Sequence, residues 1–327
     1  MKLPSVDTLI TDSFRPDTMD HVVSGGAIDH TQLTPGRFKA AMLSAGLEDV
    51  RLDWAAFNLP LLARGELPAG KVTLACLLQA AEESLCNGWQ VGPATPFVFG
   101  EGAEVDYKLA PQTQWATLQV SRDALERSGI FLPSNHAASA ARGSEAAREL
   151  QQGLQRAILS LWEIQMAHPD ITAPAAFALS LQEDLFGLFC SVLGSHPPSR
   201  NQPAGHRRGP MQTVRQAIEF FDAHLQEPVR VVELCRVTGV SWKSLERSFD
   251  KVLGVTPKRY LTLRRLSRAR RQLLAASPTE ASIAAIAAGC GLYHAGRFSI
   301  AYRELFGETP TATLERRAAP AVRFHHP

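Results

Sequence analysis

The sequence predicts an α+β chain, with an antiparallel β-barrel and a helical hairpin in the N-terminal part and an all-α C-terminal domain. Three observations support this prediction. Short apolar runs separated by turn residues fill most of 20–120. Apolar residues then recur at helical spacing between 150 and 192. Finally, one nine-residue pattern occurs twice, at 249–257 and at 302–310, within a stretch of helical periodicity.

Length and composition place limits on the class of protein. A chain of 327 residues is long enough for two domains with cores of their own. Its five cysteines are widely spaced and form no CxxC pair, which is typical of reduced thiols in a cytoplasmic protein. No run of 18 apolar residues occurs, and the N-terminal apolar stretch is too short for a signal peptide. We therefore expect a cytoplasmic protein without a membrane span.

The N-terminal domain, predicted at 1–131, contains alternating strand and turn signals. Turn signals such as TPG, LPAG and VGP separate the apolar runs. Short strands at this spacing favour an antiparallel barrel or sandwich. The predicted strands are RFKAAML, VRLDWAAF, KVTLACLL, PFVF and QWATLQV.

Residues 132–194 are predicted to form a connector and then two helices that make a hairpin. The break HPDITAP separates the two helices. The apolar stripe of the hairpin could cover the barrel or pair with a second copy of the chain, and these roles are compatible. The stripe consists of Leu150, Leu154, Ala157, Leu161 and Ile164 on the first helix and Phe177, Leu181, Leu185, Leu188 and Val192 on the second.

A Pro/Gly/Ser-rich linker is predicted at 195–210, and the charge balance changes across it. Residues 211–317 carry 17 Lys and Arg against 10 Asp and Glu, a balance of +7. Residues 1–210 carry 16 against 22, a balance of −6, and Arg323 restores the total of +2. A basic C-terminal part favours nucleic acid as a partner, although a solvated basic surface has the same composition.

The repeated pattern predicts two helix-turn-helix units. Before FDKVLGVTP, the residues Cys235, Gly239 and Leu245 have the spacing of a small contact residue, a left-handed turn and an apolar anchor. Ser241 stands where the second helix would be capped. In each copy the closing glycine ends a helix, which the following proline cannot continue.

The second copy keeps this pattern with a turn that is longer by one residue. Ala287 and Gly291 have the spacing of the first copy, and Phe298 replaces the leucine anchor one position later. Between the copies, PKRYLTLRRLSRARRQLLAAS predicts a helix, and about 18 helical residues would span about 27 Å. Such a rigid helix could hold two reading helices in major-groove segments that recur about every 34 Å along one face of DNA.

These residues carry a resemblance to a known family. GLYHAGRFSIAYRELFGETP resembles the second unit of the AraC/XylS family of bacterial transcription regulators, Gly-Phe-x5-Phe-x3-Phe-x4-Gly-x2-Pro, with Leu292 and Tyr302 replacing phenylalanines. The resemblance covers about a third of the chain, 211–317, and is followed by a tail at 318–327. The remainder resembles more weakly the cupin-like sensor domain and hairpin of longer members, including LTPGRF at 33–38.

The resemblance implies a sequence-specific regulator that binds double-stranded DNA and responds to an unnamed small-molecule effector. It also implies a homodimer, with RNA polymerase as a further candidate partner. Two alternatives are a constitutive architectural DNA-binding protein and a barrel enzyme fused to a DNA-binding domain. The long N-terminal part argues against the first. Against the second, only His21 and His30 precede residue 136 and no His-x-His occurs, so we expect neither a metal nor a cofactor.

Candidate DNA contacts follow from the outward faces of the second helices. Arg247 could donate two hydrogen bonds to a guanine edge, and Glu246 could accept from cytosine or orient Arg247. Serine, lysine and histidine at the other positions would bond bases or phosphates, and each residue could instead be ordinary helix surface. The arginines between 264 and 271 would contact phosphate or stay solvated. The candidates are Trp242, Lys243, Ser244, Glu246, Arg247, His294, Arg297, Ser299, Arg264 and Arg268.

The N-terminal domain also offers candidate effector contacts. Its aromatic side chains could line a pocket or simply form the core, and three arginines, Arg37, Arg51 and Arg64, could hold an anionic ligand. The aromatic candidates are Trp54, Trp89, Trp115, Phe57, Phe97, Phe99 and Tyr107.

Overall fold

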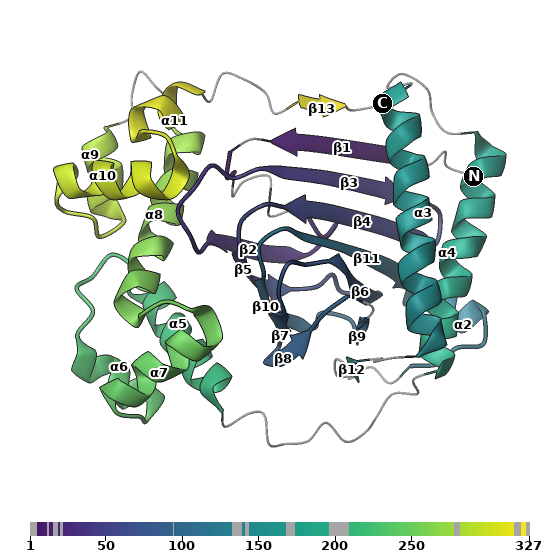
Figure 1. The fold of residues 1–327 in the computed structure, drawn as a ribbon, viewed down its shortest axis with the longest axis horizontal. Helices are drawn as coiled ribbons and strands as arrows, with labels where there is room; N and C mark the ends of the chain where they lie inside the picture. The colour runs from purple at the N-terminus through teal and green to yellow at the C-terminus, as the bar shows by residue number, and fades with distance from the viewer. Residues whose placement is uncertain are drawn as a thin grey trace.

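The structure is a computed structural model, and it confirms the α+β class. Two antiparallel sheets occupy the centre of the molecule, with the hairpin helices on one side and the C-terminal helices on the other (Figure 1). Most of the predicted linker and tail lies outside the described residues. Those residues are 5–11, 13–15, 19, 22–93, 95–132, 139–140, 144–167, 174–195, 209–277, 282–316 and 322–324.

The larger sheet has eight strands in the order β12-β9-β6-β11-β4-β3-β1-β13. All five predicted strands are confirmed, and all belong to this sheet. Its strands are β1 (Ser5–Thr11), β3 (Ala40–Gly46), β4 (Val50–Phe57), β6 (Lys71–Gln79), β9 (Phe97–Phe99), β11 (Thr113–Ser121), β12 (Ser139–Ala140) and β13 (Val322–Phe324).

The smaller sheet has five strands, in the order β2-β5-β10-β7-β8. In the described part of the chain no strand of one sheet pairs with a strand of the other, so the predicted closed barrel is not formed. The sheets instead face each other as two layers. The strands are β2 (Ala27–Gln32), β5 (Leu61–Glu66), β7 (Ser84–Cys86), β8 (Trp89–Val91) and β10 (Glu104–Leu109).

Strand β11 shows how the larger sheet separates two apolar regions. Ala116, Leu118 and Val120 pack in the cluster that includes the hairpin helices. Trp115 and Thr117 point to the opposite face, toward the smaller sheet. This alternation follows from the two-residue period of a strand. The larger sheet is therefore covered on both faces.

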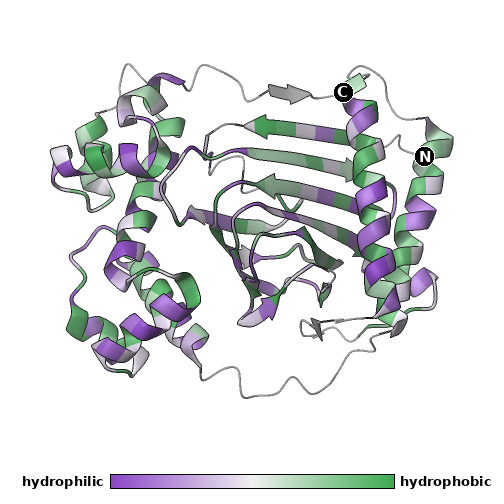
Figure 2. Ribbon diagram, viewed as in Figure 1, coloured by the Kyte–Doolittle hydropathy of each residue, from purple (hydrophilic) through white to green (hydrophobic). Residues whose placement is uncertain are grey.

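The predicted hairpin is confirmed as α3 (Glu145–Ala167) and α4 (Ala175–Ser195). Figure 2 shows hydrophilic and hydrophobic bands alternating along α3, as expected for a helix with one buried face. The two helices approach closely at Gly153, where an added Cβ would lie 2.3 Å from Leu188. Helix α4 is long and apolar enough to cross a membrane by composition, which is weak evidence because the core helix of a soluble protein passes the same test.

The C-terminal part consists of helices, as predicted. Two groups of helices lie at the two ends of α8 (Figure 1). One apolar cluster includes buried residues of both the sheets and these helices, so the two parts share a core. The helices are α5 (Pro210–Ala223), α6 (Val231–Thr238), α7 (Trp242–Leu253), α8 (Pro257–Ala275), α9 (Ile283–Gly289), α10 (Ala295–Phe306) and α11 (Pro310–Arg316); a short α2 (Arg122–Arg127) follows β11.

Candidate nucleic-acid interface

The first helix-turn-helix unit forms as the sequence predicts. Helix α6 ends at Gly239, whose φ of 66° is left-handed and therefore suits glycine. The Ser241 side chain then accepts a hydrogen bond from the Ser244 amide at 3.3 Å and caps α7. Leu245 and Phe249 are fully buried. These contacts fix which face of α7 points outward.

The outward face of α7 presents most of the predicted contact residues. Lys243, Ser244 and Arg247 are exposed, and Glu246 is half-buried. Trp242 differs from the expectation because it is half-buried and packs against the core, which leaves only part of its indole for an outside partner. A donor-rich surface of this kind can bond both base edges and phosphates.

The second unit also forms, with a longer turn. Gly291 has a φ of 75°, and an added Cβ would lie 2.7 Å from the Leu225 carbonyl oxygen. Helix α10 begins after His294, whose side chain makes no cap hydrogen bond. His294 and Arg297 are exposed, whereas the Ser299 hydroxyl donates to the Ala295 carbonyl at 3.0 Å. The second unit therefore offers fewer strong donors than the first.

Helix α8 joins the two units without a break. Its 19 residues span about 28 Å at 1.5 Å per residue. The apolar stripe predicted for this helix, Leu263, Leu266, Ala269 and Leu273, is fully buried. The buried stripe holds both units against one rod, so their spacing is fixed by the fold.

Arg270 corrects the expectation that the α8 arginines contact phosphate or stay solvated. Only 1% of its side chain is exposed, and its Nη2 lies 2.6 Å from Glu308 Oε1. Its guanidinium also donates to the Phe14 carbonyl and, at 3.1 Å, to the Tyr302 hydroxyl. It lies 4.6 Å from the centre of the Phe306 ring. Arg270 therefore ties α8 to the second unit and cannot reach DNA.

Arg264 is held by carboxylates on both sides. Its guanidinium pairs with Asp29 of β2 and, at 2.8 Å, with Asp222 of α5. It also donates to the Thr31 hydroxyl at 3.0 Å, and 15% of its side chain is exposed. Burial would lower the pKa of Arg264, but Tyr260, Asp29 and Asp222 together raise it, so the group stays charged. Arg268, the other candidate on α8, is half-buried beside the same contact.

Further contacts join the N-terminal part to both units. Arg215 of α5 lies 2.9 Å from Glu104 and 2.5 Å from Asp106 on β10. At the other end, the Gly36 amide and the Gln32 side chain donate to the Leu305 carbonyl at 3.2 and 2.8 Å.

An aromatic contact also joins the N-terminal part to the second unit. The Phe14 ring stacks on Phe306 with centroids 6.0 Å apart. The segment LTPGRF takes part in the contact between the N-terminal part and the second unit, because Gly36 belongs to it.

Sequence reasoning missed the acidic side chains of the smaller sheet. Asp29 on β2 and Asp106 on β10 face the C-terminal helices, while their neighbours His30 and Tyr107 line the space between the sheets. The sequence signal that could have found them is a charged residue that alternates with apolar neighbours along a strand. We name these two carboxylates and their arginine partners the acidic joint.

The acidic joint has a predictable pH dependence. Burial favours the neutral form of Asp29, but Arg264 and Arg271 outweigh it and hold the pKa of Asp29 below its usual range. A group whose folded pKa is depressed adds stability above its unfolded pKa of about 3.9, and loses it as the pH falls through the folded pKa. Urea unfolding should therefore show a destabilising effect of Asp29→Asn that is constant from pH 8 to pH 6 and smaller at pH 3. An effect of equal size at pH 7 and pH 3 would contradict the ion pairing.

The proposed aromatic and arginine contacts of an effector separate into two groups. Phe97, Phe99, Tyr107 and Trp115 line a cavity between the sheets. Trp54 instead packs edge-on against Trp162 of α3, with centroids 5.5 Å apart. Phe57 and Trp89 do not line the cavity either; they pack in the apolar core shared by the two domains.

None of Arg37, Arg51 and Arg64 lines the cavity. Arg51 pairs with Asp53 and Arg64 with Asp106. Among the described residues, no group of three His, Cys, Asp or Glu side chains could hold a metal ion.

Comparison with known proteins gives the class of the C-terminal part. Residues 234–316 match a family described as Helix-turn-helix domain. The Probable thc operon regulatory protein of Rhodococcus erythropolis is 33% identical over 147 residues, which cover 45% of this chain and 42% of that protein. The HTH-type transcriptional regulator GbdR of Pseudomonas aeruginosa is 37% identical over 119 residues, covering 36% and 31%. The chain therefore spans less than half the length of these curated relatives.

A solved structure agrees in sequence with this class. A transcriptional regulator from Chromobacterium violaceum, described as containing an AraC-type DNA-binding domain, is 33% identical. The match covers 33% of this chain and 95% of that one, with a TM-score of 0.31. The family match shows that residues 234–316 form a helix-turn-helix domain. The relatives that this part of the chain resembles are described as regulators of transcription.

Proposed function

We propose that the chain is a cytoplasmic regulator that binds double-stranded DNA in a sequence-specific way, with both helix-turn-helix units on one duplex. The observation that carries this proposal is the unbroken α8, which holds two exposed second helices, α7 and α10, at a fixed separation. The length of α8, about 28 Å, is compatible with successive major-groove segments about 34 Å apart because the units extend beyond its ends.

Base reading is assigned chiefly to α7. Arg247 is the strongest candidate, because it is exposed and its fork of donors matches the guanine edge. Lys243, Ser244 and Glu246 lie on the same outward side, and Trp242 contributes the edge of its ring. These side chains come from one capped helix, so they would move as a unit.

In the second unit we assign base contact to Arg297 and His294, which are exposed. The apolar Ala295 and Ile300 beside them could contact thymine methyl groups. Ser299 and Arg268 would contact phosphate. Arg264 would contact phosphate only after the acidic joint opens, because its guanidinium is paired with both Asp29 and Asp222.

Regulation is assigned to the N-terminal part. The acidic joint and the shared apolar cluster couple that part to both units, so an effector that binds the joined and separated arrangements differently would change DNA affinity. This coupling favours a regulated protein over a constitutive DNA-binding one.

Homodimer formation is assigned to the hairpin. Leu159, Met166 and Leu179 stand 40–60% exposed there, which supplies apolar surface for a second copy.

Replacing Arg247 with alanine should relax sequence preference at one base pair and cost about 1–3 kcal/mol there. Binding would be measured on duplexes selected from a random library, with every base pair of the selected site then varied, at one stated salt concentration. The reason is the loss of a bidentate contact that only one base pair accepts.

The matched control is Arg236→Ala, which removes the same charge from the exposed side of α6. It should weaken binding to all duplexes about equally, as expected for a phosphate contact or general field effect. Equal losses on selected and random duplexes for Arg247→Ala would count against a base contact by this residue.

A further inference from the structure

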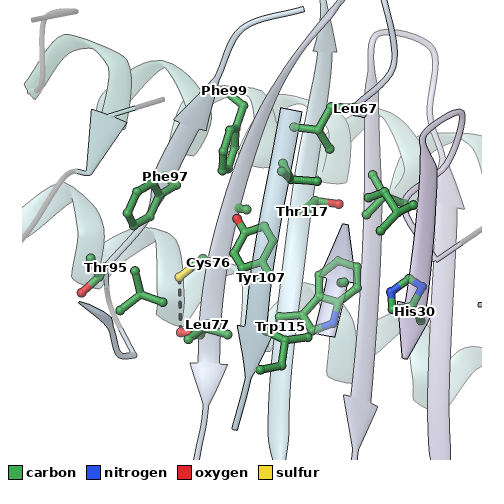
Figure 3. Close-up of a pocket in the computed structure, with 17 residues that line it drawn as sticks. His30, Leu67, Cys76, Leu77, Thr95, Phe97, Phe99, Tyr107, Trp115 and Thr117 are labelled. Carbon is green, nitrogen blue, oxygen red and sulfur yellow. Dashed lines mark hydrogen bonds between the residues drawn. The ribbon is translucent and has the colours of Figure 1, made fainter. Parts of the chain in front are cut away.

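A pocket of about 250 Å³ lies where the acidic joint holds the smaller sheet against helices α5 and α8. The cavity between the two sheets is on the other face of the smaller sheet, and Figure 3 shows His30 and Tyr107 in its lining. Because side chains alternate along a strand, their neighbours Asp29 and Asp106 line the pocket instead. At roughly 30 Å³ for a water-sized group, the pocket has room for about eight such groups, enough for a small organic molecule.

The inner part of the pocket contains charges that balance. Three aspartates and three arginines line it, and every one of the six takes part in an ion pair. They are Asp29, Asp106, Asp222, Arg64, Arg215 and Arg264. Since their formal charges cancel, this part of the pocket offers no excess charge to a ligand.

Three glutamates stand at the outer edge of the pocket and give it an excess of negative charge. Glu66 on β5, Glu104 on β10 and Glu219 on α5 are all exposed. Glu104 lies 2.9 Å from Arg215, whereas Glu66 and Glu219 form no ion pair within the described part of the chain. Because the inner charges cancel, the lining as a whole has a net formal charge of −3.

Two of these glutamates face each other across neighbouring strands. Glu66 and Glu104 are directly opposite in the antiparallel pair of β5 and β10, so their side chains lie on the same face of the sheet. Like charges in this arrangement repel and destabilise the strand pair. A cation held between the two carboxylates would remove this repulsion. The mouth of the pocket therefore favours a positively charged ligand.

A tyrosine hydroxyl at the inner end of the pocket is independent evidence for a ligand. Tyr260 lines the pocket and is fully buried, and its hydroxyl forms no hydrogen bond within the part of the chain that the structure describes. Burial raises the pKa of this hydroxyl above its usual range, so it stays neutral and can accept a hydrogen bond. A donor on a ligand would recover the free energy that such a buried group costs.

We propose that this pocket binds an aliphatic polyamine, a flexible chain with two or more ammonium groups. One ammonium group would lie among the three glutamates, and the chain would extend inward so that an N–H group donates to Tyr260. Ammonium groups supply both the positive charge that offsets the lining and the donors that carboxylate and hydroxyl oxygens accept. A metal ion does not fit, because no group of His, Cys, Asp or Glu among the described residues could hold one.

The walls of the pocket come from both parts of the chain. Strands β2, β5 and β10 belong to the N-terminal part, and helices α5 and α8 to the C-terminal part. A ligand that contacts both walls stabilises their joined arrangement. Its effect on DNA rests on the proposed function. With the joint closed Arg264 stays paired with aspartates, so a bound polyamine should weaken DNA binding.

The test uses the full-length chain and four probes: putrescine, butylamine, butanediol with a hydroxyl at each end, and Mg²⁺. Binding is followed by calorimetry at low salt, where exposed charges are least screened. Putrescine should bind about 2–10 times more tightly than butylamine, the ratio that one further net hydrogen bond gives. Butanediol and Mg²⁺ should not bind. Either of them binding as tightly as putrescine, or no binding of putrescine, would overturn the proposal.

Two variants locate the binding. Glu66→Gln/Glu219→Gln removes two unpaired carboxylates and should weaken putrescine binding about 2–30-fold, as expected for two exposed ion pairs. Tyr260→Phe removes only the hydroxyl and should weaken binding about tenfold, the usual effect of a hydrogen bond to a charged group. The unfolding temperature of the free Tyr260→Phe chain should not fall, because the hydroxyl has no partner there.

The matched control for these variants is Glu149→Gln. Glu149 is an exposed glutamate of α3 and forms no ion pair among the described residues, so its loss should leave putrescine affinity unchanged. Equal losses in Glu149→Gln and Glu66→Gln/Glu219→Gln would show only a general attraction of cations to acidic surface, and the pocket would be refuted.

DNA binding measured in parallel separates this proposal from the proposed function. Polyamines also bind DNA phosphates, so putrescine must weaken DNA binding of the unaltered chain more than that of Glu66→Gln/Glu219→Gln. If putrescine binds in the pocket and both chains respond equally on DNA, the pocket assignment stands and its regulatory role is refuted. If the chain selects duplexes by sequence but binds no amine, the DNA-binding function stands and the pocket assignment is refuted.

Discussion

Replacing Arg270 with methionine is expected to lower the free energy of unfolding by about 3 kcal/mol, the lower end of the range for breaking a buried ion pair. The substitution keeps much of the apolar volume but leaves Glu308, which is only 10% exposed, without its closest cation. Arg316 remains 2.8 Å from Glu308, which is why the smaller value is expected. The Phe14 carbonyl would also lose its donor. Urea unfolding at pH 7 measures the change.

The control for this prediction is Arg268→Met, two residues away on α8. Arg268 is half-buried and makes no ion pair among the described residues, so its loss should change stability by less than about 0.5 kcal/mol. Adding Glu308→Gln to Arg270→Met should restore part of the lost stability, because the orphaned charge is then removed. If Arg270→Met and Arg268→Met destabilise the chain equally, Arg270 has no special structural role.

Local sequence signals predicted the elements whose pattern is strong. The strands β4, β6 and β11 are apolar runs because the larger sheet is covered on both faces. Strands β2 and β10 were not singled out, because Asp29 and Asp106 interrupt their apolar pattern. Asp29 is half-buried and Asp106 is buried, and both pair with arginines on helices more than 100 positions away, which no local pattern contains.

At the candidate site, the roles set by local contacts were predicted, whereas those set by distant contacts were not. Gly239, Ser241 and Leu245 act within one turn and its flanking helices, so their spacing alone was enough to predict their roles. The arginines of α8 have similar sequence neighbours but different partners in the folded chain. Arg270 is buried against Glu308, and Arg265 donates to the Leu225 and Glu227 carbonyls. Their partners depend on the tertiary arrangement, so the sequence could only place them on a helix.

Opening the acidic joint is expected to strengthen DNA binding. In the double variant Asp29→Asn/Asp106→Asn, Arg264 and Arg271 lose Asp29, and Arg215 loses Asp106 but keeps Glu104. The C-terminal helices then separate more readily from the sheet. Affinity for a selected duplex without effector should rise about tenfold, within the usual range of coupling between sites. The released arginines can also reach phosphate, so the slope of log K against log salt should steepen by about 1–2.

The single variant Asp29→Asn should show a smaller rise, because Asp106 still holds Arg215 at 2.5 Å. The matched control is Asp49→Asn, which removes an equal charge from a pair with Arg127 at 2.6 Å; the Asp49 amide donates to Gln182 of α4. That control should leave both affinity and salt slope unchanged, because Asp49 contacts neither unit. If the joint withholds these arginines from DNA, freeing them must change at least the electrostatic part of binding. A folded double variant with the affinity and salt slope of the unaltered chain would therefore show that the joint does not restrain the DNA-binding surface.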